Sequence, residues 1–492
     1  MINIVNTKAE LITALTETIT FSGNCIKNRI WYRGDPSEIE QFFKQTQTDN
    51  VSKARFWAAT PTHGHIRKFH TGIFATVVDS ITELIMSDMQ SVEIKDQTVM
   101  DRWAEIASDN QWDSNLLSDA ITETLTVGDG VFKISYDADI SKLPIIEFVS
   151  GEDLEIITKR NRPQEYRFSS YYDKNDDKYK LVESYKRGSI EYKLYDKTDK
   201  EVPLSTIDEL GGYTDVYWKE DYFLCVPLKF YKSPKWKERG MSILERKSDN
   251  IDALDEIVSQ WIEAIRDGKV KNYIPESLLP KNDKGEVVRG NPFDNKFIQT
   301  ETSMREGAQD TIEQKQADIN YNAFVESYAS MLDLVLQGIV SPSTLGIDLK
   351  KTDNAESQRE KEKTTMKTRG KIVDVLTEVI PEVVVTALRC QDGINKMSSE
   401  YDDITVVFGE YASPSFEDKL NIINQASAAN TMSIERQVEE LWGDSLTDEE
   451  KSEEVQRLKE LRGISLAEEE PDDIHNFGED KIDDEEEETE LE

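Results

Sequence analysis

The chain has 492 residues and carries 97 acidic against 59 basic side chains, for a formal net charge of −38. At roughly 150 residues per folded domain, this length predicts about three packed units. The acidic surplus argues against broad electrostatic adhesion to nucleic acid, since neutralising phosphates requires lysine and arginine. No stretch approaches the roughly 20 apolar residues that span a bilayer, the opening residues lack the layout of a secretory signal, and 3 widely spaced cysteines favour a reducing cytosol.

The first predicted elements are helices, and short strands follow them. Residues 1–60 form an N-terminal segment without an assigned pattern, and residues 61–240 are expected to form one mixed unit. Within that unit, apolar residues at helical spacing predict amphipathic helices over 67–89 and 103–125. Between 131 and 203, β-branched and aromatic runs alternate with turn clusters, which predicts an antiparallel meander of hairpins. The predicted fold class is therefore α+β.

A long helix with two distinct faces is predicted over 241–268. Asp249, Glu256 and Glu263 are spaced by sevens, so they share one side of it. Gly268 is expected to end the helix. On the other side, apolar residues step by three and four positions and form a narrow seam suited to helix packing, namely Ile251, Leu254, Val258, Trp261 and Ile265.

A small extended module is predicted over 269–318, because prolines and glycines punctuate this segment and residues 282–288 suggest a hairpin turn. A second long helix is predicted over 319–340, with Glu326 and Asp333 seven positions apart on one side. Its apolar seam keeps the same spacing as the first and consists of Tyr321, Val325, Tyr328, Leu332, Val335 and Ile339. The two long helices are thus expected to carry the module between them.

The C-terminal third is predicted to begin with a loop over 341–357. Residues 358–412 should form a helix, kinked at Pro381 because proline removes a ladder hydrogen bond, and one returning strand. Residues 413–466 read as short polar helices. From Glu468 to the end there are 15 acids and one base, so residues 467–492 are predicted to be a disordered tail that either aids solubility or recruits a basic partner.

The patterns of common enzyme chemistry are absent from the sequence. There is no P-loop, no HExxH and no GxSxG. His63, His65 and His70 lack the cysteine or acidic companions of a metal site, and the acids near Asp173 lack the glycine and glutamate of a calcium loop. We therefore expect no enzyme, no catalytic residue, no metal and no cofactor.

Two basic patches contrast with the acidic background. Residues 229–247 hold seven bases and two acids, interleaved with Phe230, Tyr231 and Trp236. Such mixing suits nucleic-acid backbones, but the aromatic residues equally fit the role of anchoring a linker. Residues 350–371 hold eight bases and four acids, which fits either an ordinary solvated helix face or a rim that faces phosphates. For each patch the sequence leaves its two interpretations open.

The order of these parts resembles the portal (head–tail connector) proteins of tailed bacteriophages, of the long-tailed siphophage type. VPLKFYK (226–232) leading to GMSILERKSDNIDALDEI (240–257) is similar to the family's approach to its first stem helix. RDGKVKNYIPESLL (266–279) resembles the exit from that helix into the clip. SPSTLGID (341–348) followed by a polar helix resembles the tunnel loop and the kinked helix after it. The resemblance covers nearly the whole chain except its first 60 residues and its acidic tail.

The resemblance implies a wing (61–240 and 358–412), stem helices (241–268 and 319–340), a clip (269–318), a tunnel loop (341–357) and a helical crown (413–466). It implies a ring, typically dodecameric, at the portal vertex of the virion, assembled in the host bacterial cytoplasm. Double-stranded DNA would pass through the ring during packaging and ejection. The implied partners are the terminase large subunit, the major capsid and scaffolding proteins and a head–tail adaptor, with no membrane.

Three groups of residues carry hypotheses under this resemblance. Acids of the stem would form negative rings that repel phosphates, so that a duplex slides: Asp249, Asp252, Glu256, Glu263, Glu326 and Asp333. Near the tunnel loop, Lys350, Lys351 and Arg359 would contact DNA. The clip would present to a neighbouring clip or an adaptor Leu278, Leu279, Val287, Val288 and Phe293.

Two other functions remain as alternatives. One is a non-enzymatic phage scaffold or adaptor that acts only through protein contacts. The other is a hydrolase or nuclease whose carboxylates the sequence does not single out.

Overall fold

The computed structural model divides the chain into two compact units, Met1–Gly409 and Glu410–Glu492. In the first unit it describes residues 20–46, 55–59, 66–175, 177–275, 282–283, 297–300, 312–316, 318–347, 355–395, 401 and 404–409. In the second it describes residues 420, 423–424, 426–427, 431–442 and 448–461. The architecture is mixed helix and largely antiparallel sheet, which confirms the α+β class.

Helices dominate the N-terminal part of the first unit, and they are α2 (Phe21–Arg33), α3 (Pro36–Thr46), α5 (Ile73–Asp88), α6 (Gln97–Asp109) and α7 (Leu117–Val127). The helix predicted over 67–89 is α5. The one predicted over 103–125 is two helices, α6 and α7, joined by a π-helical turn (Trp112–Leu116). The break follows Gln111, whose φ of 51° lies in the left-handed region and ends regular α-helical bonding.

Two antiparallel sheets replace the single predicted meander. The larger one runs in the order β4-β5-β6-β7-β8, with β9 also on β7. Its strands are β4 (Leu154–Lys159), β5 (Arg162–Lys174), β6 (Asp177–Lys186), β7 (Ser189–Tyr195), β8 (Glu201–Val202) and β9 (Val216–Tyr217). Tyr166, Phe168 and Tyr185 alternate onto its buried face. The smaller sheet pairs β2 (Gly130–Ser135) with β3 (Ile145–Ser150) and with β10 (Cys225–Leu228), a partner the sequence pattern did not indicate.

The strand predicted near 403–411 is β14 (Ile404–Phe408). It pairs antiparallel with β1 (Met89–Ile94), a strand far away in the sequence that follows α5 directly. Arg369 reinforces this junction, because its guanidinium donates to Asp88 Oδ2 over 2.5 Å and to the carbonyl of Gly409 over 2.6 Å. Long-range pairing of this kind ties the C-terminal end of the unit to its N-terminal helices.

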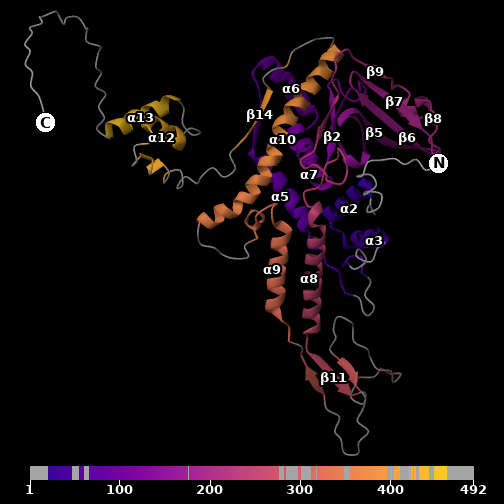
Figure 1. Cartoon of the computed structure of the whole chain (residues 1–492), viewed down its shortest axis with the longest axis vertical. Helices are drawn as coiled ribbons and strands as arrows, with labels where there is room; N and C mark the ends of the chain where they lie inside the picture. Colours follow the sequence, from indigo (N-terminus) through magenta and orange to yellow (C-terminus); the bar gives the residue numbers. More distant parts are fainter. Residues whose placement is uncertain are drawn as a thin grey trace, which may run out of the picture. The chain divides into compact units, whose positions relative to one another are not determined.

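The two predicted long helices are α8 (Ser248–Asp267) and α9 (Tyr321–Leu336), which lie side by side (Figure 1). We call them the helix pair. A three-stranded sheet of β11 (Lys271–Pro275), β12 (Phe297–Thr300) and β13 (Glu313–Lys315) connects them. The hairpin expected over 282–288 falls mainly outside the described residues. The described strands form a mixed sheet, in which β12 is parallel and β13 antiparallel to β11.

After α9 a short 3₁₀ turn (Pro342–Leu345) leads toward the long helix α10 (Ala355–Asn395). α10 continues as helix on both sides of Pro381, and the predicted kink stays a prediction. Its buried side includes Ile372, Leu376, Ile380 and Val383, which join the main apolar core with α5, α7 and the inner end of the helix pair.

The second unit contains α12 (Ile434–Trp442) and α13 (Asp448–Leu461), which pack against each other. Lys459 on α13 reaches Glu435 on α12 over 2.6 Å, and Lys451 reaches Glu439 over 3.2 Å. These are the polar helices that the sequence indicated over 413–466. The acidic tail over 467–492 lies outside the described residues.

Candidate functional site: the helix pair and its base

One face of α8 packs against α9. Ile251 and Leu254 on α8 and Leu332 and Val335 on α9 are fully buried in the main core. Farther from the core, the ring of Trp261 stacks parallel on Phe324, with 6.1 Å between their centroids. Lys247, just before α8, donates to the carbonyl of Leu334 near the end of α9 over 2.6 Å. The helices therefore form a joined pair along their length.

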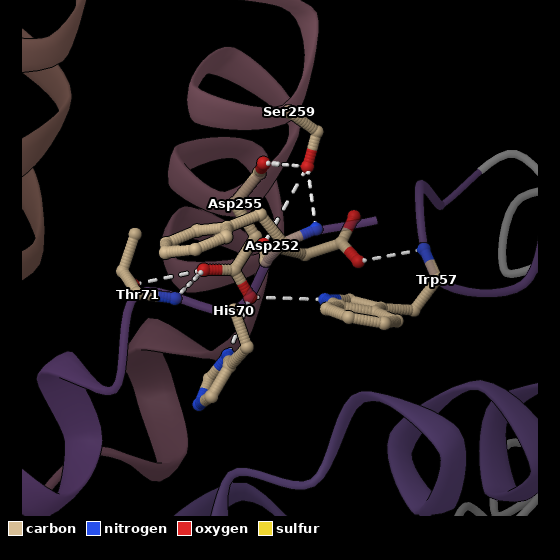
Figure 2. A network of polar contacts seen from close by, with 7 residues as sticks. Trp57, His70, Thr71, Asp252, Asp255 and Ser259 are labelled. Carbon is tan, nitrogen blue, oxygen red and sulfur yellow. Dashed lines mark hydrogen bonds and ion pairs between the residues drawn. The ribbon is translucent and has the colours of Figure 1, made fainter. Parts of the chain in front are cut away.

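A second face of α8 is polar and buried, and it holds two segments from the N-terminal part of the chain (Figure 2). Asp252, Asp255 and Ser259 are spaced three and four apart, so they lie on one side of the helix. Asp252 accepts hydrogen bonds from the backbone N–H of Phe56 over 2.9 Å and of Trp57 over 3.2 Å. We call these three α8 residues the base cluster.

Asp255 is the centre of the base cluster and is fully buried. Its Oδ1 accepts from the backbone N–H and the hydroxyl of Thr71, at 2.9 and 2.8 Å. Its Oδ2 accepts from the indole Nε1 of Trp57 at 3.0 Å and lies 2.7 Å from Nδ1 of His70. Ser259 accepts from the N–H of Phe69 at 2.9 Å. These bonds fix residues 55–59 and 66–71 to the base of α8.

His70 completes this arrangement from the other side. Its ring lies 5.2 Å from that of Trp31 on α2, centroid to centroid. Gly34, which ends α2 with a φ of +72°, leaves the space beside it, since a Cβ there would lie 3.0 Å from Cδ2 of His70. Through His70, the carboxylate of Asp255 connects α8 to the N-terminal helices. The sequence pattern gave this histidine no role, because it lacks the companions of a metal site.

Burial affects the pKa of Asp252 in the base cluster. The pKa of Asp252 is raised mainly by desolvation, and hydrogen bonds from the N–H groups of Phe56 and Trp57 act against that rise. Asp252 is only 6% exposed. Its prediction as a channel-lining acid is therefore wrong for the folded subunit, because its carboxylate is buried and bonded to the backbone of Phe56 and Trp57.

The third face of α8 is open to solvent and carries the other predicted acids. Asp249 pairs with Arg55 over 2.5 Å, and Glu263 pairs with Arg266 over 3.3 Å. Glu256 accepts from the side-chain amide of Gln260 over 2.8 Å. These three acids therefore share one surface stripe, as the spacing by sevens indicated, although basic neighbours reduce the charge of two of them.

The solvent-facing side of α9 is more strongly acidic than the solvent-facing side of α8. Glu326 and Asp333 are exposed, and within the described part of the chain neither forms an ion pair. Serines lie between them at 327 and 330, also exposed. The exposed Leu334 lies on the same side, and α9 contains no lysine or arginine, so this side offers negative charge and no basic side chain that could bind a phosphate.

The apolar seam of the pair is incompletely covered at its outer end, which is the end next to the sheet of β11, β12 and β13. Tyr321 is 60% exposed and Ile265 is 51% exposed, although their spacing placed them in the helix–helix seam. Val325 is exposed too, and so are Val270 and Ile312 in the adjoining sheet region. Clustered exposed apolar side chains of this kind are typical of surfaces that contact another molecule.

The remaining predicted site residues fall outside what the structure describes. Lys350 and Lys351 are not described, and of Arg359 only the backbone, within α10, is described. None of the predicted clip residues is described, namely Leu278, Leu279, Val287, Val288 and Phe293. These hypotheses stay predictions.

The base cluster is what the sequence reasoning missed. A signal was present, because Asp255 interrupts the apolar side of an otherwise amphipathic helix and Asp252 and Ser259 flank it at helical spacing. Its partners could not be found in this way, since Trp57 and Thr71 are nearly 200 positions away. Among the described residues no group of three or more His, Cys, Asp or Glu side chains is placed to hold a metal ion.

Comparison with known proteins gives little. No family model matches the chain, and no curated protein matches it. Among solved structures, a chain from the neck of an empty GTA particle, computed with C6 symmetry, aligns at 12% identity with a TM-score of 0.34. The alignment covers 80% of this chain and 92% of that one. A TM-score this low carries no argument about function. In the described part of the chain, no helix combines the length and the apolar character needed to cross a membrane.

Proposed function

We propose that this chain is a structural subunit of a phage portal, and that copies of it form a ring around a channel for double-stranded DNA. The observation that carries the proposal is the helix pair, which combines a joined seam, an anchored base and a solvent-facing side of α9 with exposed acids and no basic residue. The resemblance in the order of elements supports the same role. The proposal includes no catalytic step.

The exposed apolar residues at the outer end of the pair support assembly. Tyr321, Val325 and Ile265 would expose apolar area in a monomer that neighbouring copies could cover. A contact between different surfaces of successive copies closes into a ring when the rotation between them divides the circle. A ring of such subunits would bring several helix pairs around one axis.

The acidic face of α9 favours a role in which DNA passes through the channel and is not bound there. Repetition of Glu326 and Asp333 around an axis would create bands of negative charge. Lysine and arginine bind DNA by releasing its condensed counterions, and carboxylates release none. At physiological ionic strength the Debye length is about 8 Å, so the repulsion between carboxylates and phosphates acts over about that distance. A duplex would then be centred without lasting contacts, which is what a conduit requires.

The further roles follow the resemblance and belong to the proposal. The ring would dock the terminase large subunit during packaging and a head–tail adaptor afterwards. It would sit at one vertex of the capsid, in contact with the major capsid and scaffolding proteins, after assembly in the bacterial cytoplasm.

The first test is direct imaging of the purified full-length chain. We expect mass photometry to show oligomers and negative-stain images to show rings with a central hole. Particles without a hole would favour the alternative of a scaffold or adaptor that acts only through protein contacts. A monomer at every concentration and ionic strength tried would contradict the proposal.

The second test concerns the charge of the channel. Glu326→Lys with Asp333→Lys should convert the α9 face into one that binds duplex DNA, and the filled-head yield should fall at least tenfold in a packaging assay. The matched control reverses two exposed acids on other helices, Glu83→Lys and Asp374→Lys, with the same change in net charge. Equal packaging by both variants would contradict the proposal that this side of α9 faces the channel.

A further inference from the structure

Residues 229–239, which follow β10 on the way to α8, form a loop that the proposed function does not use. We call it the lysine loop. The sequence left open whether its aromatic residues stack on a ligand or anchor the loop. In the structure they anchor it, since Phe230 is buried and the ring of Trp236 packs edge-on against Phe21 of α2, with 5.3 Å between centroids.

The backbone of the lysine loop is fixed by its own hydrogen bonds. The N–H of Ser233 donates to the carbonyl of Arg239 over 2.9 Å, and the N–H of Met241 donates to the carbonyl of Tyr231 over 2.9 Å. The buried hydroxyl of Ser233 accepts from the N–H groups of Lys235 and Trp236 at 3.2 and 3.1 Å. The loop is therefore a defined surface.

Its root is held by a buried carboxylate. Asp129 accepts from the guanidinium of Arg239 over 2.9 Å and from the N–H of Gly240 over 2.6 Å. Gly240 must be glycine for this approach, because a Cβ there would lie 2.0 Å from the carbonyl oxygen of Gly128. Arg239, the one arginine of the loop, is thus used internally and leaves the lysines as its outward charges.

Four lysines project from this loop and are exposed, at 229, 232, 235 and 237. Within the described part of the chain, Lys229, Lys232 and Lys237 form no ion pair with an acid, and Lys229 donates only to the carbonyl of Glu238. The positive charge of the loop also affects a neighbouring lysine. The pKa of Lys27 on α2 is lowered to about 8, mainly by burial, and the charges of Arg55 and Lys235 add to the lowering while Glu245 opposes it.

The chemistry of the loop favours a protein partner over a nucleic acid. Its aromatic rings are engaged in anchoring, so no stacking platform for bases remains. An acidic surface on a protein needs no such platform, because the charges of the lysines alone can match it.

Copies of this chain supply such a surface. On α6, for example, Asp101, Glu105 and Asp109 form an exposed row at helical spacing, and none of the three pairs with a base among the described residues. We propose that the lysine loop is the basic half of a contact between neighbouring copies and docks on an acidic surface of the next copy. The contact joins two different surfaces, as ring closure requires, and in this respect the inference rests on the proposed function.

Zero-length cross-linking with a carbodiimide tests this contact, because the reagent joins a lysine amine only to a carboxylate in direct contact. The full-length chain is assembled from equal parts of unlabelled and ¹⁵N-labelled protein. We expect cross-linked peptides from Lys229, Lys232 or Lys237 in mixed-isotope pairs, which identify a contact between copies and the acid that makes it. Cross-links from these lysines only in same-isotope pairs would overturn the inference.

Charge reversal provides the second arm. Lys229→Glu, Lys232→Glu and Lys237→Glu together should raise the concentration needed for assembly at least tenfold, and the wild-type requirement should itself rise with salt. The control reverses three exposed lysines elsewhere, Lys159→Glu, Lys178→Glu and Lys219→Glu, with the same change in net charge. We expect the control to assemble as the wild type does.

The outcomes separate the two proposals. If the wild type and the loop variant assemble equally well, the contact is wrong and the ring stands. If the loop variant assembles normally but loses a measurable affinity for duplex DNA, the partner is a nucleic acid and the contact is again wrong. If the wild type itself remains a monomer, both proposals fail.

Discussion

Two faces of α8 put acidic side chains to opposite uses. On the face covered by residues 55–59 and 66–71, Asp252 and Asp255 are buried, and backbone N–H, indole and hydroxyl donors surround their oxygens. On the solvent-facing side, Glu256 contacts Gln260 and Glu263 contacts Arg266, both on the same helix. Since a buried carboxylate without donors is very costly, the base acids are tied to structure, while the surface acids are free to serve electrostatics.

A second contrast runs along the apolar seam, between the end near the main core and the end far from it. Leu254 at the base is fully buried, whereas Ile265, three turns farther along the same stripe, is 51% exposed. In a single subunit the apolar seam is therefore buried in its inner half, near the main core, and partly exposed to solvent in its outer half. The two ends differ in what covers them, and substitutions at each end should separate stability from assembly.

The largest effect is expected at the centre of the base cluster. Asp255→Ala would leave the indole N–H of Trp57 and the N–H and hydroxyl of Thr71 buried without an acceptor. We expect a loss of about 4 kcal/mol in unfolding free energy, measured by denaturant titration with tryptophan fluorescence. Glu256→Ala, at a half-buried neighbour that bonds only the surface amide of Gln260 among the described residues, should change it by less than about 0.5 kcal/mol. Similar stabilities for the two variants would contradict the structural role assigned to the buried Asp255.

A smaller effect is expected in the seam. Leu254→Ala should cost about 3 kcal/mol, since it removes a fully buried side chain and leaves a cavity. Ile265→Ala should cost less than about 1 kcal/mol in the subunit, because half of the side chain is already in water. The order should invert in the assembly assay, where Ile265→Ala is expected to weaken oligomers. An Ile265→Ala variant that assembles like the wild type would show that this end of the seam makes no contact between copies.

The smallest effect is a pH dependence at Asp252. Because burial raises its pKa in the folded state, the folded chain binds the proton more tightly than the unfolded one. Its contribution to stability therefore grows as the pH falls through the raised pKa toward the ordinary value of 3.8, and it is lost as the pH rises. The stability advantage of the wild type over Asp252→Asn should be larger near about pH 4 than near about pH 7. A constant difference across that range would contradict a raised pKa.

Several parts of the fold could be predicted because their signals are local. The three-and-four spacing in α8 and α9 and the alternation in β5 and β6 follow from the geometry of the helix and the strand. Pairings across long distances were missed. β10 completes the β2–β3 sheet and β1 pairs with β14, and neither partner has a local signature of its neighbour.

The sequence by itself determined that α8 has an apolar face and acids on its other sides, because side-chain direction along a helix is set by position alone. Only the tertiary structure decided which acids are covered. Asp249 and Asp252 are three positions apart on one helix, yet the first is on the surface and the second is buried under Phe56 and Trp57. The physical reason is that periodicity is a local property, whereas burial depends on which distant segment packs against each face.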